Sequence, residues 1–388
     1  MKARQLLGLA GLVGFPVATY AGYPALAWAT ALLLPRPHVN DPTYKPFITV
    51  VIAAHNEATL IGAKVANTLK QRYPPNRIAC IVVCDGCTDD TASAAHSAGD
   101  ARLQVIELPR QKGKLAAIRA AHSHASGEII VLTDANAMLV SDALCHLVAP
   151  FADPTVAAVS GVKQVVGGPE SLYWRYEFWI RSKESASGSI AGSDGALYAV
   201  RASAIDASAC AGAADDLLIS LRAAKAAGRL VLAPRAVSSE EPTSTVVESL
   251  LARSRTTSGA LFALAGWPGL FKPWRDDLWW KLAGHKLLRI ATPAVMLAGA
   301  AVLAGPPTAS RVRTWLKVAV VGVAVVLPAA RTDGRLRRVC DLACYAAVAN
   351  VAALAGLARF VARRPIDAWS PVRLSDSRAG GIPQRSLN

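Results

Sequence analysis

The feature that most constrains this chain is a long apolar stretch near its N-terminus. No charged residue occurs between Gln5 and Pro35, and roughly 20 apolar residues in a helix are enough to cross the ~30 Å hydrocarbon core of a membrane. A cleaved signal peptide is the competing interpretation, because Ala27-Trp28-Ala29 is similar to a cleavage site. The stretch is much longer than the ~7–15 residues of a signal-peptide core, so we interpret residues 1–40 as a membrane anchor.

Three more apolar runs lie in the last third of the chain, at Leu287–Gly305, Val318–Ala330 and Val339–Ala362. They follow a segment in which four Trp residues alternate with Lys and Arg, a composition typical of the lipid headgroup layer. We therefore predict three C-terminal regions: an interfacial amphipathic segment at 266–286, transmembrane helices at 287–362, and a basic, disordered tail at 363–388.

The distribution of charge argues against nucleic-acid binding. The net charge is +15, yet Met1 to Glu248 contains 22 basic and 21 acidic residues, whereas Ser249 to Asn388 contains 20 and 6. The excess positive charge thus accompanies the apolar runs, as expected for residues that flank membrane spans. The middle of the chain is nearly neutral and offers no phosphate-binding stripe.

Between the apolar ends, the sequence predicts an α/β domain. Short β-branched runs alternate with helical patterns from Phe47 to about Pro234, as in a mostly parallel sheet flanked by helices. The predicted strands are 47–54, 78–84, 102–108 and 128–134, and the predicted helices lie near 58–71, 89–98 and 114–125.

Polar residues follow several of these strands, where ligands bind in open α/β sheets. The turn after the first strand lacks the glycines of a dinucleotide site. Asp85 ends the second strand, where it suits either a nucleobase N–H or simple turn chemistry. Asp134 and Asn136 follow the fourth strand and offer the oxygen ligands that a hard cation prefers.

The order of these motifs resembles that of a known family. The strings VVIAAHNEATL, IVVCDGCTDDT, KGKLAAIRAA and SGEIIVLTDAN succeed one another as in membrane-bound family 2 glycosyltransferases. The similarity continues into GSDGALYAVR, ADDL and RSRT, and we assign residues 45–265 to a glycosyltransferase catalytic domain.

The resemblance implies a GT-A fold and an inverting transfer from a nucleotide-diphosphate sugar, a UDP-sugar in our interpretation. Asp134 and Asn136 match the family's metal motif, which implies Mg²⁺ or Mn²⁺ as cofactor. Asn136 is neutral where many relatives carry a second carboxylate, and this should weaken metal affinity. Asp216 matches the general base, Asp215 its partner or an N-cap, and Asp194 a position near the donor sugar and acceptor.

The resemblance implies that the remaining matched positions bind the nucleotide and its diphosphate. Glu57 has an alternative role as a helix cap, and the Arg pair an alternative role as solvated charges. The implied substrate-binding residues are Ala53, Asn56, Glu57, Asp85, Lys114, Arg253 and Arg255.

The resemblance also implies a multi-pass cell-membrane enzyme whose catalytic domain faces the cytosol, where activated sugars are available. Its partners would be the donor, a glycan, lipid or lipid-linked acceptor, and membrane lipids, with no nucleic acid. The Arg-Trp pair of processive relatives is missing from the helix around Arg255, so processivity is unsupported. The alternative is a membrane-anchored nucleotide-sugar binding or scaffold protein without turnover.

Overall fold

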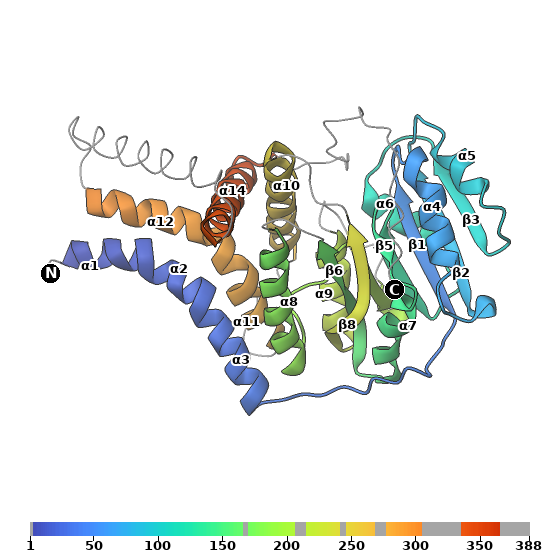
Figure 1. Cartoon of the computed structure of the whole chain (residues 1–388), viewed down its shortest axis with the longest axis horizontal. Helices are drawn as coiled ribbons and strands as arrows, with labels where there is room; N and C mark the ends of the chain where they lie inside the picture. Colours follow the sequence, from blue (N-terminus) through green and yellow to red (C-terminus); the bar gives the residue numbers. More distant parts are fainter. Residues whose placement is uncertain are drawn as a thin grey trace.

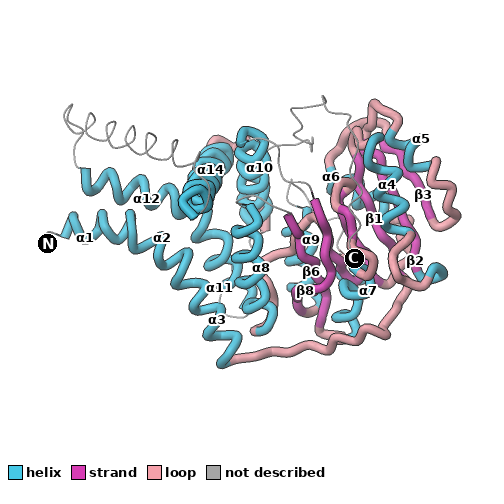
Figure 2. The backbone as a smooth tube through the Cα atoms, in the orientation of Figure 1, coloured by secondary structure: helices cyan, strands magenta, loops and turns pink. Residues whose placement is uncertain are grey.

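A computed structural model describes residues 3–165, 170–205, 215–240, 246–267, 277–304 and 335–364. Its centre is an eight-stranded mixed sheet with the order β3-β2-β1-β4-β7-β6-β8-β5, and helices cover both faces (Figures 1 and 2). The strands are β1 (Ile48–Ala54), β2 (Ile78–Asp85), β3 (Leu103–Leu108), β4 (Ile129–Asp134), β5 (Met138–Leu139), β6 (Val156–Val165), β7 (Leu197–Arg201) and β8 (Arg229–Glu240).

The four strands predicted from the sequence form one parallel half of this sheet. β1 pairs in parallel with β2 and β4, and β2 with β3, so their carboxyl ends meet at one edge. The helices that connect and cover them are α4 (Ala58–Leu69), α5 (Thr91–His96), α6 (Lys114–His122), α7 (Ala143–Val148), α8 (Glu170–Ala186) and α9 (Asp215–Ala227). The predicted fold class, a mostly parallel sheet flanked by helices, is confirmed.

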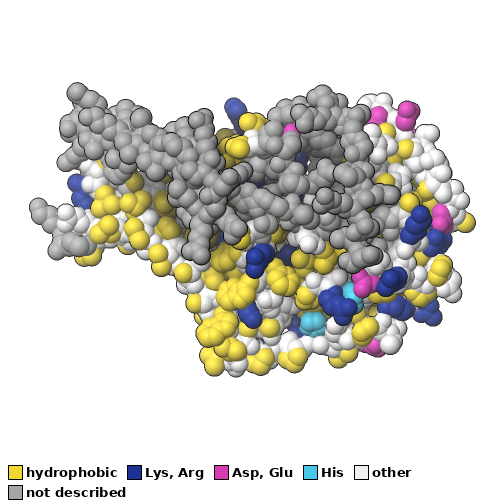
Figure 3. Space-filling model, viewed as in Figure 1, with side chains coloured by type: hydrophobic (Ala, Val, Ile, Leu, Met, Phe, Trp, Pro, Cys, Tyr) yellow, Lys and Arg dark blue, Asp and Glu magenta, His cyan; other side chains and the backbone are white. Residues whose placement is uncertain are grey.

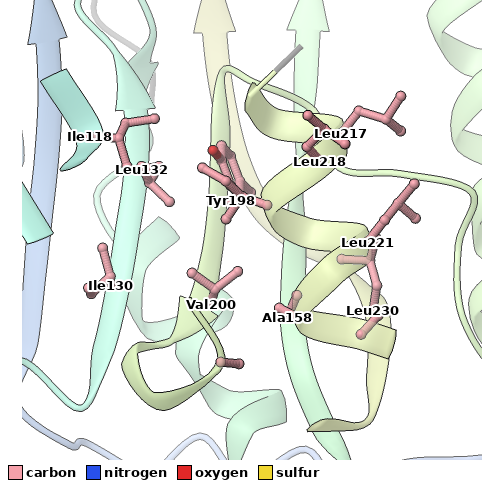
Figure 4. Packing of buried hydrophobic residues seen from close by; sticks show 14 of the residues in the cluster. Ile118, Ile130, Leu132, Ala158, Tyr198, Val200, Leu217, Leu218, Leu221 and Leu230 are labelled. Carbon is pink, nitrogen blue, oxygen red and sulfur yellow. The ribbon is translucent and has the colours of Figure 1, made fainter. Parts of the chain in front are cut away.

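Burial on both faces explains why β1, β2 and β4 are nearly continuous apolar runs. Alternate residues of β1 belong to two separate cores, with Ile48, Val50 and Ile52 on one face and Val51 on the other. On the latter face, side chains from α6 and α9 pack onto the strands around Tyr198 (Figure 4). Packing on both faces fixes the positions of the strand ends. The polar residues that follow the carboxyl ends of the parallel strands therefore lie at one edge of the sheet, which we call the polar edge.

Three described helical runs are long and apolar enough to cross a membrane, at Ala3–Leu33, Asp277–Ala304 and Cys344–Val361. The first run contains α1 (Ala3–Leu9), α2 (Phe15–Val17) and α3 (Tyr23–Leu33), the second contains α11 (Asp277–Leu282) and α12 (Leu288–Ala304), and the third lies within α14 (Arg335–Val361). The helix α10 (Val246–Ala265) follows β8 in the chain and packs against α14. Figure 1 shows α1 and α12 side by side. Directly after α1, a Cβ atom added to Gly11 would lie 3.1 Å from the Cα of Gly299 in α12, so the glycines permit the close approach of the two helical runs.

The structure tests only part of the predictions for the C-terminal region. The helical run that contains the first predicted span begins at Asp277 and continues through residue 287 without a break, so part of the predicted interfacial segment is helix. The run Val318–Ala330 lies outside the described residues, as does the tail beyond Arg364.

A buried polar cluster joins the anchor helices to α8. Glu184 accepts hydrogen bonds from the Tyr23 hydroxyl and, at 2.8 Å, from Nδ1 of His285. The other ring nitrogen of His285 lies 2.8 Å from Glu177, which also pairs with Arg289. Because buried charges must be paired, this cluster fixes how the sheet and its covering helices are attached to the apolar helices.

Candidate active site

Asp134 lies at the centre of the polar edge of the sheet. It is the last residue of β4 and stands opposite Ala53 of β1 in the parallel register. One of its carboxylate oxygens forms a 2.7 Å ion pair with Nζ of Lys114, the first residue of α6, and the two side chains are 27% and 13% exposed. The pair is therefore only partly open to solvent, and the structure brings these two predicted site residues together.

Asp85 controls how Lys114 reaches this position. Its two carboxylate oxygens each accept a 2.8 Å hydrogen bond, one from the backbone N–H of Lys112 and one from that of Gly113. Gly113 has φ +90°, a conformation that favours glycine. Asp85 is 1% exposed, so its carboxylate holds the turn into α6, and the predicted contact with a nucleobase stays a prediction.

The loop after β1 is fixed by local hydrogen bonds. Asn56 has φ +55°, and its side-chain oxygen accepts a 2.8 Å hydrogen bond from the backbone N–H of Thr88. The backbone N–H of Glu57 donates to Thr91. Glu57 occupies the N-cap position of α4, where its carbonyl accepts hydrogen bonds from the N–H groups of Leu60 and Ile61, and its buried side chain makes no capping hydrogen bond. Ala53 is buried within β1.

A second group of charges, from β6, β8 and the loop before β7, lies within electrostatic reach of Asp134. Lys163 forms an ion pair with Glu240. Burial alone would lower the pKa of Lys163. The neighbouring carboxylates of Glu240, Asp194 and Asp134, of which Glu240 has the largest effect, outweigh burial and raise this pKa. Burial also raises the pKa of the Glu240 carboxyl, against the opposing effect of the Lys163 ammonium. Neither Lys163 nor Glu240 was predicted from the sequence.

Asp194 is held with one oxygen available. Its Oδ1 accepts a 3.1 Å hydrogen bond from the backbone N–H of Ala196, and its own N–H donates to Ser160. Its Oδ2 is buried and has no hydrogen-bond partner among the described residues. A buried acceptor without a partner is costly, so this oxygen is a candidate contact for a bound group.

Asp216 lies directly beside this loop. A Cβ atom added to Gly195 would be 3.5 Å from Oδ2 of Asp216. The Asp216 carbonyl accepts hydrogen bonds from Ser193 and Ser220, which tie the first turn of α9 to the loop. Asp216 is half-buried. The side chain of Asp215 lies outside the described part of the structure.

The structure separates the two predicted arginines of α10. Burial lowers the pKa of Arg255, and the negative charge of Asp134 opposes this effect, so Arg255 lies toward the polar edge. Arg253 instead hydrogen-bonds the hydroxyl of Tyr345, and its guanidinium lies 4.5 Å from the centre of that ring and 5.5 Å from the Tyr173 ring. Arg253 therefore packs among aromatic residues of α8 and α14.

A buried lysine supports the turn that follows Asp134. Lys64 of α4 is fully buried and donates to the Thr133 hydroxyl at 2.9 Å and to the carbonyl of Ala137. Thr133 in turn donates to the carbonyl of Ala196. Burial lowers the pKa of Lys64 to about 7, although Asp134 opposes this effect. The sequence carries a signal for this role, because Lys64 follows Ile61 at the spacing of a core-facing helix position.

The polar edge fits a divalent ion held jointly with a ligand. Within the described ranges, no three His, Cys, Asp or Glu side chains converge to hold a metal by themselves. Mg²⁺ and its analogues are commonly bound by one or two carboxylates together with substrate phosphates. Asp134 and the exposed Asn136 supply hard oxygen donors of the kind that such an arrangement requires.

Comparisons with known proteins identify the family and the fold. The profile of "Glycosyl transferase family 2" matches residues 49–204. A beta-monoglucosyldiacylglycerol synthase of Nostoc sp. is 28% identical over 193 residues, which cover 46% of this chain and 41% of the relative. An N-acetylglucosaminyltransferase of Rhizobium leguminosarum bv. trifolii is 33% identical over 133 residues, which cover 33% of this chain and 72% of that relative.

The structure is similar to that of mannosyltransferase PcManGT from Pyrobaculum calidifontis in complex with GDP-Man and Mn²⁺. The TM-score is 0.69 at 26% sequence identity, with 92% of this chain and 99% of the other covered. The similarity therefore includes apolar helices as well as the sheet domain. It confirms the predicted GT-A type fold, whereas the match to the Nostoc relative spans less than half of that protein's length.

Proposed function

The chain belongs to glycosyl transferase family 2, and from this premise we propose that it is an integral-membrane inverting glycosyltransferase. It transfers a sugar from a nucleotide-diphosphate donor, a UDP-sugar, to a glycan, lipid or lipid-linked acceptor. The lipid product named for the Nostoc relative and the three apolar helices support an acceptor presented by the membrane. The catalytic domain faces the cytosol, where nucleotide sugars are available.

The convergence of opposite charges around Asp134 carries this proposal. Lys114 forms an ion pair with Asp134. The negative charge of Asp134 also raises the pKa values of Arg255, Lys163 and Lys64 against the effect of burial. Such a cluster offers cations to an incoming diphosphate and carboxylates to a divalent ion. A protein that only buried these charges would gain little stability from them, because the desolvation penalty offsets much of the attraction.

Each part of the cluster has a separate role in the transfer. Asp216 accepts the proton of the attacking acceptor hydroxyl while the oxygen–anomeric carbon bond forms and the bond to the diphosphate breaks, with inversion at that carbon. Lys114 and Arg255 stabilise the negative charge that develops on the departing diphosphate. Asp194 accepts hydrogen bonds from hydroxyl groups of the donor sugar through its unpartnered oxygen.

The divalent cofactor belongs to the same edge. Asp134 and Asn136 hold Mg²⁺ or Mn²⁺, which neutralises the diphosphate when bound. The Mn²⁺ in the related mannosyltransferase structure supports this assignment. Because Asn136 supplies only a neutral carbonyl, we expect weaker metal binding than with two carboxylates.

Release of nucleoside diphosphate by the purified full-length protein tests the function. UDP- and GDP-sugars are supplied in turn with Mn²⁺, membrane lipid and candidate acceptors, and the Asp216→Asn variant is the control. We expect release and a glycosylated product with a UDP-sugar, and neither with Asp216→Asn. Turnover with GDP-sugars alone would contradict the UDP assignment. Tight donor binding without release for any pair would favour the alternative, a binding protein without turnover.

A further inference from the structure

We propose that a groove at the membrane end of the catalytic domain binds the phosphate-bearing headgroup of an anionic phospholipid. The groove is separate from the candidate active site, and the inference rests on the membrane anchoring given under the proposed function. It has a volume of about 680 Å³, within the range of small-ligand sites. Its walls are the linker at 35–40, α7, the end of α8 and the middle of β8.

The groove is built into the fold, because the linker that forms one wall is tied to the catalytic domain. The backbone N–H of Arg36 donates to the carbonyl of Ala186 at 2.8 Å. Arg229 donates to the carbonyl of Arg36 at 2.9 Å, and the N–H of Val39 donates to Asp153 at 3.1 Å. The wall is therefore positioned in advance of any ligand.

Two guanidinium groups lie at this groove with no carboxylate to neutralise them. Arg36 and Arg235 are exposed and line the groove, and neither side chain forms an ion pair with another of the described residues. Nearby carboxylates already have partners, since Asp153 pairs with Arg229 at 3.4 Å and Asp142 with His146 at 3.1 Å. The groove thus presents net positive charge, which phosphate recognition requires.

The floor of the groove favours a lipid over free phosphate. The apolar lining of the groove includes the exposed residues Pro35, Pro37 and Pro234. Inorganic phosphate would leave these side chains uncovered, whereas the glycerol backbone and first methylenes of a phospholipid would bury them. Figure 3 shows basic and histidine side chains on the lower part of this face, close to the hydrophobic surface of the helical region.

The groove begins where the N-terminal span ends. Leu32, Leu33 and Leu34, directly before the linker, are 61%, 78% and 65% exposed and are the side chains that acyl chains would cover. On α8, Trp179 is 39% exposed and lies 6.0 Å from the ammonium of Lys183. Tryptophan and lysine are typical of the headgroup layer, so the groove lies at the depth of lipid phosphates.

Direct binding of short-chain lipids tests the proposal without reference to turnover. Delipidated full-length protein in neutral detergent is titrated with dioctanoyl phosphatidylglycerol, dioctanoyl phosphatidylcholine and inorganic phosphate. Native mass spectrometry counts bound lipid and a thermal-shift titration gives its affinity. The test variant is Arg36→Gln/Arg235→Gln, and Lys70→Gln/Arg72→Gln removes two exposed charges outside the groove as the matched control.

We expect phosphatidylglycerol to bind saturably, with affinity falling about 30-fold in the groove variant and changing less than about twofold in the control. Each single substitution, Arg36→Gln or Arg235→Gln, should cost about 5-fold, which keeps the test available if the double variant does not fold. Equal binding of both lipids, equal loss in the control, or saturable binding of inorganic phosphate at similar affinity would each overturn the proposal. Failure of sugar transfer would leave this readout unchanged.

Discussion

The buried lysine behind the Asp134 turn permits a prediction in which stability and activity move in opposite directions. Lys64 is fully buried, and among the described residues its ammonium donates hydrogen bonds only to the Thr133 hydroxyl and the Ala137 carbonyl. We predict that Lys64→Met makes the protein more stable at acidic pH and lowers transfer about 10- to 100-fold, because the turn that carries Asp134 loses its support.

The magnitude follows from the pKa of Lys64, which falls from 10.5 to about 7. At about 1.36 kcal/mol per pKa unit, the fold disfavours the charged lysine by about 5 kcal/mol well below pH 7. Methionine removes this cost but leaves the Ala137 carbonyl without its donor, a loss of about 1–3 kcal/mol. The variant should therefore gain about 2–4 kcal/mol of unfolding free energy near pH 6.

The gain should shrink as pH rises. Between the folded pKa of about 7 and the unfolded value of 10.5, the unfolded state holds the proton that the folded state has lost, so wild-type stability rises with pH. The difference between wild type and Lys64→Met should fall by about 2 kcal/mol from pH 7 to pH 9. Urea unfolding in detergent at several pH values measures this difference.

Lys70→Met is the matched control, since Lys70 lies at the end of the same helix and is exposed. We expect its stability to stay within about 0.5 kcal/mol of wild type at every pH. The reasoning is refuted if the difference between wild type and Lys64→Met does not change with pH, or if wild type is the more stable protein near pH 6.

Three further predictions concern the site itself. Asp216→Asn should abolish transfer while donor affinity by calorimetry stays unchanged; full activity would exclude it as the base. Asn136→Asp should tighten Mn²⁺ binding about tenfold in activity titrations, and an unchanged metal dependence would remove this residue from the metal site. Arg255→Gln should raise the donor KM about 10- to 100-fold. Arg253→Gln should mainly lower the melting temperature, because it loses the contact with Tyr345. The reverse pattern would contradict the placement of the two arginines.

In the parallel half of the sheet, the edge strand β3 is only partly buried, whereas β1, β2 and β4 are buried on both faces and were predictable for that reason. Such strands are continuous β-branched runs, and β1 and β4 begin and end within one residue of the predicted ranges. The other half was not assigned strand by strand. β7 enters between β4 and β6 in antiparallel orientation, and periodicity along the chain does not encode such long-range pairing.

Sequence reasoning located a candidate site residue where that residue ends a strand, as at Asp134. It was missed where the residue acts through a distant partner. Glu240 ends β8 and meets Lys163 of β6 because those two strands are neighbours in the sheet, which no local motif indicates. Arg253 and Arg255 are two residues apart on one helix, and only packing decides that the first meets Tyr345.

Two motifs that the sequence presents separately act as one unit in the fold. Asp85 looks like a ligand contact when taken alone, yet its two oxygens are already engaged by the amides of Lys112 and Gly113. Those hydrogen bonds fix the start of α6 and hence aim Lys114 at Asp134, 2.7 Å away. Loss of the Asp85 carboxylate would therefore displace the Lys114 ammonium from the position that we propose for the diphosphate, without removing the charge of Lys114. A substitution at Asp85 acts first on the geometry of Lys114, whatever a nucleobase contributes in addition.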